Sequence, residues 1–454
     1  MIGNEETPHS LGTEKVGKLL MQYAFPAIIA MTATSLYNIT DSIFIGHGVG
    51  PMALSGLAIT FPIMNLAAAF GSLVGVGAST LLSIRMGQKD QETANDILGN
   101  VLILNLIMGI GFSLVTFPLL NPILHFFGAS EETLAYSYDF MVIILAGNVV
   151  THMYFGLNAL LRSSGHPQKS MMATIFTVLI NMVLNPLFIF GFNWGIQGSA
   201  AATIISQVLV LCWQIRLFNN QDQFIHWKKG IYRLKKKIVT DSLSIGMAPF
   251  LMNAASCLIV IIINRQLIRH GGDLAVGAYG IVNRMIFLFG MVVIGLNQGM
   301  QPIAGYNYGA KSYDRVLSVL KKSIFFGTII MTIGFLIMQL FPHAIAAIFT
   351  TEEQLVDMAA IGLRWVFAMC PLVGFQMVSS AFFQSIGKPG KSIILAMTRQ
   401  VLLLIPLLLI LPNFFEVNGV WMSIPIADII SVILTGILLT GELKHFRKRD
   451  ETIL

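Results

Sequence analysis

Long apolar runs constrain this chain more than any other feature of its sequence. Only 11% of its 454 residues are charged, whereas hydrophobic types make up 55%. A soluble protein of this size carries roughly a quarter charged residues, which cover its surface. Because this chain lacks that charge and its apolar runs reach the ~20 residues that a spanning helix needs, its surface is expected to face lipid. The sequence therefore predicts an all-α polytopic membrane protein.

Turn-forming and polar residues separate the runs, for example at 87–90 and at 387–390. They delimit twelve expected transmembrane helices. The expected helices are 19–45, 53–84, 95–117, 134–160, 170–190, 197–218, 241–268, 275–303, 318–341, 356–382, 392–411 and 418–440.

Basic residues indicate the orientation of these helices. If the N-terminus is placed in the cytoplasm, 23 of the 28 lysine and arginine residues fall in the tails and loops on that side. The outer loops after the first, third, fifth and eleventh helices contain none. The positive-inside rule then predicts a multi-pass membrane protein with both termini cytoplasmic.

The chain also contains an internal duplication. The segment 159–170 is repeated at 381–392, and the same offset of 222 residues relates Gly77 to Gly299. Each copy holds six helices, an even number, so that both copies enter the membrane from the same side and form parallel repeats. We expect an N-lobe at residues 1–218, a basic cytoplasmic linker at 219–240 and a C-lobe at 241–454.

Two acidic residues, Asp41 and Asp428, lie well inside the expected helices. A carboxylate at the centre of a bilayer costs ~2.5–3.5 kcal/mol, so its presence calls for a reason. Asp41 shares the outer half of the first bundle with Asn181, Asn185 and Thr203. Oxygen ligands of this kind suit H⁺ or Na⁺. The alternative is a polar cluster that only joins helices. That role does not need a titratable group such as Asp41. If the ion is Na⁺, Asp41 is the expected ligand.

Two further positions inside the helices, Pro26 and Arg399, carry weaker signals. Pro26 removes a backbone hydrogen bond from the first helix and permits a kink. Arg399 and Asp428 are expected to pair between the last two helices, which would lower the cost of both charges. Such a pair is interpreted as structural, with a substrate contact as the alternative.

Several functions are excluded by missing motifs. The sequence contains no Walker A motif, no His-Glu-x-x-His motif and no catalytic set of serine, histidine and aspartate that we can support. Its three cysteines lie inside apolar runs without paired spacing. We therefore expect a transporter driven by an ion gradient, with no enzymatic activity, no cofactor and no nucleic-acid partner.

Taken together, these residues resemble the multidrug and toxic compound extrusion (MATE) family over nearly the whole chain. The resemblance rests on Pro26 and Asp41, the segment 160–167, Asn181 to Pro186, and the segment 198–203. It implies twelve helices in two lobes that form a V, and antiport of organic cations against H⁺ or Na⁺. We expect a monomer in the lipid of the bacterial inner membrane that exports amphipathic or cationic small molecules.

The resemblance also assigns roles to particular residues. The family's N-lobe cation site maps onto Asp41, Asn181, Asn185 and Thr203. Tyr37 and Asn158 match positions that line the N-lobe cavity. Some members have an aspartate where this chain has Asn185, and members of another branch carry acids in the seventh and tenth helices, which have none in their interiors here. Coupling is therefore expected to rest on the N-lobe.

Three other functions compete with this interpretation. A lipid-linked oligosaccharide flippase of the wider superfamily tends to have fourteen helices and an arginine-rich cavity, whereas we count twelve helices and only two deep arginines. An intramembrane enzyme would need a catalytic set, and a channel would need a repeat of pore-lining acids. The exporter is the preferred hypothesis.

Overall fold

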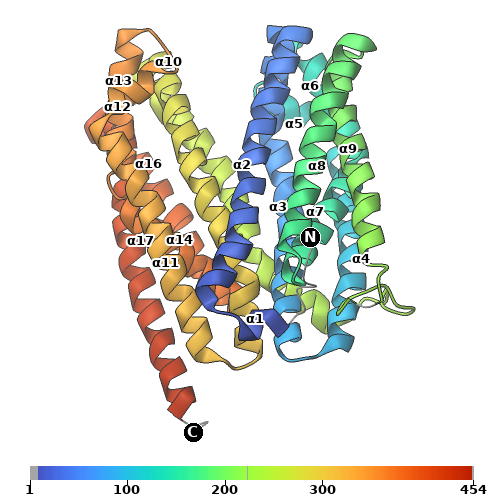
Figure 1. The fold of residues 1–454 in the computed structure, drawn as a ribbon. Coiled ribbons are helices and arrows are strands. Elements are labelled where there is room, and N and C mark those ends of the chain that lie inside the picture. Colours follow the sequence, from blue (N-terminus) through green and yellow to red (C-terminus); the bar gives the residue numbers. More distant parts are fainter. Residues whose placement is uncertain (1–8, 222, 452–454) are drawn as a thin grey trace.

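The computed structural model describes residues 9–221 and 223–451, and these residues form helices without any β-strand (Figure 1). The first half contains α1 (His9–Thr13), α2 (Val16–Gly48), α3 (Pro51–Gly87), α4 (Gln91–Thr116), α5 (Leu120–Phe126), α6 (Glu131–Ala146), α7 (Asn148–Ser163), α8 (Pro167–Pro186), the π-helical η1 (Leu187–Gly191) and α9 (Gly195–Leu217). The second half contains α10 (Lys236–Gly309), α11 (Tyr313–Leu340), α12 (Pro342–Ala347), α13 (Glu353–Phe367), α14 (Cys370–Ser385), α15 (Pro389–Met397), the π-helical η2 (Thr398–Leu404), α16 (Ile405–Ile410) and α17 (Pro412–Glu451).

The longest element, α10, consists of two membrane spans. Its 74 residues would extend over about 110 Å as one straight helix, more than three times the thickness of a bilayer core. Gly272 interrupts it with φ 65° and ψ −163°. A residue without a Cβ adopts this backbone conformation readily. The segments 236–271 and 273–309 therefore correspond to the expected helices at 241–268 and 275–303.

The remaining spans also match the sequence prediction. In the described part of the chain, nine helices are long and apolar enough to cross a membrane, and α10 is one of them. Two bent pairs form further spans: α6 with α7, at 56°, and α13 with α14, at 51°. With α10 counted as two spans, the total is the twelve that the apolar runs predict.

The helices are arranged in two lobes, α2 to α9 and α10 to α17 (Figure 1). The lobes spread apart at one end and converge at the other, where α1, the loop after α9 and the C-terminal end of α17 lie. We call these the spread end and the converging end. The loop after α9 packs on α4, where the backbone N–H of Lys235 donates to Asn100 Oδ1 at 2.9 Å and Lys235 Nζ pairs with Asp96.

The contact between the lobes depends on glycines in α3 and α10. A Cβ on Gly77 would lie 1.9 Å from the carbonyl oxygen of Ser242, and a Cβ on Gly246 would lie 1.8 Å from that of Leu73. No side chain fits at such distances, so the two backbones touch directly. Close approach of this kind is how membrane helices gain packing energy in the absence of a hydrophobic driving force.

The same contact occurs a second time, between α2 and the second segment of α10. A Cβ on Gly299 would lie 2.4 Å from the backbone nitrogen of Ala24. Adding 222 to the number of Gly77 gives Gly299, and subtracting 222 from that of Gly246 gives Ala24. The two contacts are therefore exchanged by the duplication. The interface is self-complementary, as between the subunits of a two-fold dimer.

We predict that Gly246→Ala weakens the contact between the lobes. The added methyl group would overlap the backbone of α3, and overpacking in a tight core costs about 1–3 kcal/mol. The thermal unfolding midpoint of the purified protein in detergent should fall. Gly436→Ala in α17 is the matched control, because nothing lies within 4 Å of its Cβ position and alanine is the better helix former. Equal midpoints for the two variants would contradict the proposed packing.

Candidate functional site

Three helices of the first lobe each contribute two polar side chains to one cluster. On each helix the two residues are four positions apart, a spacing that places them on the same helical face. The pairs are Tyr37 and Asp41 on α2, Asn181 and Asn185 on α8, and Ser199 and Thr203 on α9. The structure thus brings together the four predicted ion-coupling residues and Tyr37.

Asp41 accepts hydrogen bonds from two of these helices. Its side chain is buried, with 7% of its surface exposed. Asn185 Nδ2 donates to Asp41 Oδ1, and the hydroxyl of Ser199 donates to the same oxygen at 2.6 Å. A buried carboxylate without such donors would be strongly destabilising. α8 and α9 therefore stabilise the carboxylate on α2.

The hydrogen bonds continue from Asp41 to Tyr37. Asn185 Nδ2 lies 3.5 Å from Asn181 Oδ1, and Asn181 Nδ2 donates to Thr203 Oγ1 at 3.2 Å. The hydroxyls of Thr203 and Tyr37 are 2.8 Å apart. A change at Asp41 can therefore be transmitted to Tyr37 through groups that are in direct contact.

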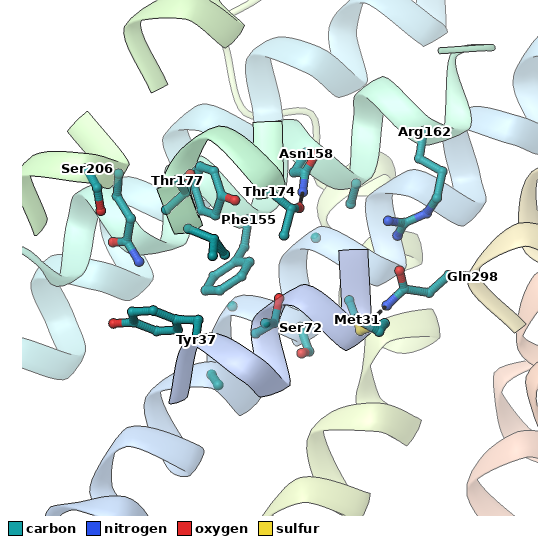
Figure 2. A pocket seen from close by; sticks show the side chains of 18 of the residues that line it. Met31, Tyr37, Ser72, Phe155, Asn158, Arg162, Thr174, Thr177, Ser206 and Gln298 are labelled. Atoms are coloured by element: carbon teal, nitrogen blue, oxygen red, sulfur yellow. Dashed lines mark hydrogen bonds between the residues drawn. The ribbon is translucent and has the colours of Figure 1, made fainter. Parts of the chain in front are cut away.

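A cavity of about 270 Å³ lies beside this network (Figure 2). α2, α3, α7, α8 and α9 line it together with Gln298 of α10. Tyr37, Asn181 and Thr203 belong both to the cavity wall and to the hydrogen-bond network, whereas Asp41 and Asn185 lie behind that wall. A molecule in the cavity would thus contact the network without touching Asp41.

Asn158, predicted for the cavity, lines it from α7. Its Nδ2 donates to Thr174 Oγ1 at 3.1 Å, and its Oδ1 is buried without a hydrogen-bond partner. An unsatisfied buried acceptor favours a ligand that carries a donor.

Two residues of this site, Ser199 and Arg162, lie outside the set predicted from the sequence. Ser199 lies in the quoted segment 198–203, and its spacing of four from Thr203 was the available signal. The sequence predicts a loop position for Arg162, because the expected helix ends at residue 160. The structure extends α7 to Ser163, which places Arg162 in the cavity wall.

Metal ligands of the usual kind are absent from the described residues, which contain no group of three or more histidine, cysteine, aspartate or glutamate side chains placed to hold a metal ion. The cluster offers one carboxylate with amide and hydroxyl oxygens instead, a donor set for a proton or a weakly held hard cation. Asn185 Oδ1 is buried without a partner and adds one free acceptor.

Pro26, the expected kink position, lies inside α2, which remains one helix from Val16 to Gly48. Arg399 and Asp428 lie in the second lobe, away from the cluster. Arg399 Nε donates to Asp428 Oδ1 at 2.7 Å, between η2 and α17, and the side chain of Asp428 is 3% exposed.

The sequence and the fold both have known counterparts. The MatE family model matches residues 26–187 and 246–410. Multidrug export protein MepA of Staphylococcus aureus (strain N315) is 27% identical over 413 residues, which are 91% of each chain. MepA of Staphylococcus haemolyticus (strain JCSC1435) is 26% identical over 417 residues, 92% of each chain.

Two solved structures illustrate the likeness in fold. A MATE family transporter of the MOP superfamily in an outward-facing conformation has a TM-score of 0.91 at 24% identity, covering 97% of this chain and 99% of that one. The MATE multidrug transporter DinF-BH, solved as a complex with a ligand, has a TM-score of 0.89 at 35% identity, covering 97% of this chain and 98% of that one.

We predict that Asp428→Asn and Arg399→Gln each lower the thermal stability of the purified protein. Arg399→Gln leaves the buried carboxylate of Asp428 without its partner, and Asp428→Asn leaves the half-buried guanidinium of Arg399 without its partner. Breaking a buried ion pair costs ~3–5 kcal/mol. The double variant removes both charges and should recover much of the loss. A double variant no more stable than the worse single variant would show that the pair has no such role.

Proposed function

Because this chain belongs to the MatE family, we propose that it exports amphipathic and cationic organic molecules in exchange for H⁺ or Na⁺. The chain is a transporter and not an enzyme. One observation carries the proposal of coupled exchange. The hydrogen-bond network of the buried Asp41 includes Asn181 and Thr203, and these two residues also form part of the cavity wall.

The proposed coupling follows from the hydrogen-bonding capacity of Asp41. As a carboxylate, its Oδ1 accepts from both Asn185 and Ser199. A protonated carboxyl group carries a donor and loses acceptor capacity, and a bound Na⁺ would compete for the same oxygen. Either ion would weaken the two hydrogen bonds, because it withdraws negative charge from the carboxylate. Asn185 and Ser199 could then shift, and Asn181 and Thr203 would shift with them. Ion binding and substrate binding would therefore favour different positions of the cavity wall.

Alternating access would require the two lobes to rock against each other. We propose the N-lobe at 1–218, the linker at 219–240 and the C-lobe at 241–454 as the moving units. The glycine contacts close the converging end while the lobes are spread at the other. Pro26 lies two residues after Ala24, where α2 contacts Gly299. Its missing hydrogen bond provides a place where α2 can bend beside that contact.

We predict that Asp41→Asn abolishes export while the protein still folds. Asparagine has nearly the same shape as aspartate, so packing survives, but the titratable charge is lost. Dye efflux from proteoliposomes should fall to the level of empty vesicles. For the wild-type protein, dye efflux measured under a proton gradient and under a sodium gradient separately identifies the coupling ion.

Asp273→Asn serves as the control, because it removes a carboxylate that is exposed and lies outside the cluster. Its efflux should equal that of the wild type. Full efflux by Asp41→Asn under both gradients would refute the coupling role of Asp41.

We also propose that the converging end faces the cytoplasm of a bacterial cell, so that both termini lie inside. We predict that a cysteine replacing the exposed Lys229 in the linker resists an impermeant thiol reagent in intact cells. A cysteine replacing Met52, which is 44% exposed, should react. Both are made in a background without Cys212, Cys257 and Cys370. Labelling at position 229 but not at 52 would reverse the orientation.

A further inference from the structure

One residue of the cavity wall has no role in the proposed coupling. Arg162 is the only charged side chain among the described residues that line the cavity, and it is 9% exposed. Its Nε is buried without a hydrogen-bond partner. No acidic side chain of the described chain forms an ion pair with it. The cavity thus contains an unpaired buried cation, which is costly unless an anion joins it.

A purely local role does not account for this arrangement. Arg162 lies in the last turn of α7, where a positive charge favours the carbonyl end of a helix. A solvated lysine or arginine would serve equally well there. Instead, the guanidinium of Arg162 extends from α7 toward the end of the cavity where Gln298 and Met31 lie (Figure 2).

The surroundings of Arg162 suit a ligand with an anionic end. Gln298 reaches this end of the cavity from α10, and its amide nitrogen has only the weak acceptor Met31 Sδ, at 3.7 Å. That nitrogen is a second donor beside the guanidinium. Tyr37 and Ser206 lie at the opposite end (Figure 2). Asp41 is ten residues beyond Met31 on α2, about 15 Å along a helix axis, so the two ends differ in charge.

We propose that Arg162 binds the carboxylate of planar aromatic substrates, and that the cavity therefore takes zwitterions and aromatic carboxylates in preference to the matching cations. The guanidinium fork forms two parallel hydrogen bonds with a carboxylate, a geometry that lysine does not reproduce. Phe155 and Val178 are among the aromatic and aliphatic side chains that line the cavity, and they would contact the planar part. A zwitterion places its cationic part toward the Asp41 end. This inference rests on the proposed export function and shifts the preferred substrates from organic cations to molecules that carry a carboxylate.

The test compares a rhodamine that has a free carboxylate with the methyl ester of the same dye. Fluorescence anisotropy gives the dissociation constant of each dye for the purified full-length protein. Wild-type protein should bind the carboxylate dye at least tenfold more tightly than the ester. Arg162→Gln should reduce this ratio at least tenfold, and Arg162→Lys should give an intermediate ratio. An unchanged ratio in Arg162→Gln overturns the proposal.

A second measurement uses only the wild-type protein, in case Arg162→Gln does not fold. An aromatic carboxylate such as naphthoate should displace the bound carboxylate dye, whereas naphthamide should displace it at least tenfold less well. Equal displacement overturns the proposal.

The outcomes for the wild-type protein separate this proposal from the export function. If the protein binds and exports the ester but prefers it to the carboxylate dye, the role of Arg162 is refuted and the export function stands. Wild-type protein that binds neither dye overturns the proposal, and failure to export any organic dye under either gradient refutes the export function.

Discussion

A carboxylate buried in a membrane bundle has to receive hydrogen bonds from its neighbours, and the rest of the site follows from this requirement at Asp41. The donors, Asn185 and Ser199, come from two different helices, so that α8 and α9 must pack beside α2. Their helical neighbours one turn away, Asn181 and Thr203, then necessarily face the same space. That space is the cavity. The position of the cavity wall therefore follows from the hydrogen bonds that the Asp41 carboxylate needs.

The duplication repeats the six-helix bundle, but the cluster around Asp41 occurs in the first lobe alone. The positions 222 residues after Asn181 and Asn185 are Leu403 and Leu407, and the mate of Asp41 is Asn264, one residue further along the repeat. The second lobe thus retains the helices and the interface without the carboxylate and its donors. Its buried acid, Asp428, interacts with Arg399 instead. One lobe has a titratable group beside the cavity, and the other has an internally neutralised pair.

Much of the fold could be predicted from the sequence. The length of the apolar runs and the bias of basic residues reflect the bilayer, and the constant offset between similar segments reflects the duplication. The all-α fold of twelve spans in two repeats and the family resemblance are confirmed. Spacing of four also indicated that Asn181 and Asn185 share a face. Ser199 could not be predicted from its residue type, because a serine in a membrane helix usually forms a hydrogen bond with its own backbone. Arg162 was misplaced because basic residues are typical of cytoplasmic loops, whereas the structure extends α7 over it.

The paired glycine contacts have a consequence for the history of the chain. A six-helix ancestor that contacted itself through positions corresponding to Gly77 and Ala24 would have formed this interface as a homodimer. In that dimer a single substitution would have altered both contacts at once. Fusion of two such copies into one chain would separate the two contacts, so that each could change independently. The two contacts of the present chain differ in this way, because Ala24 faces Gly299 in one and Gly246 faces Gly77 in the other. The two contacts have therefore already diverged in how closely they allow the backbones to approach.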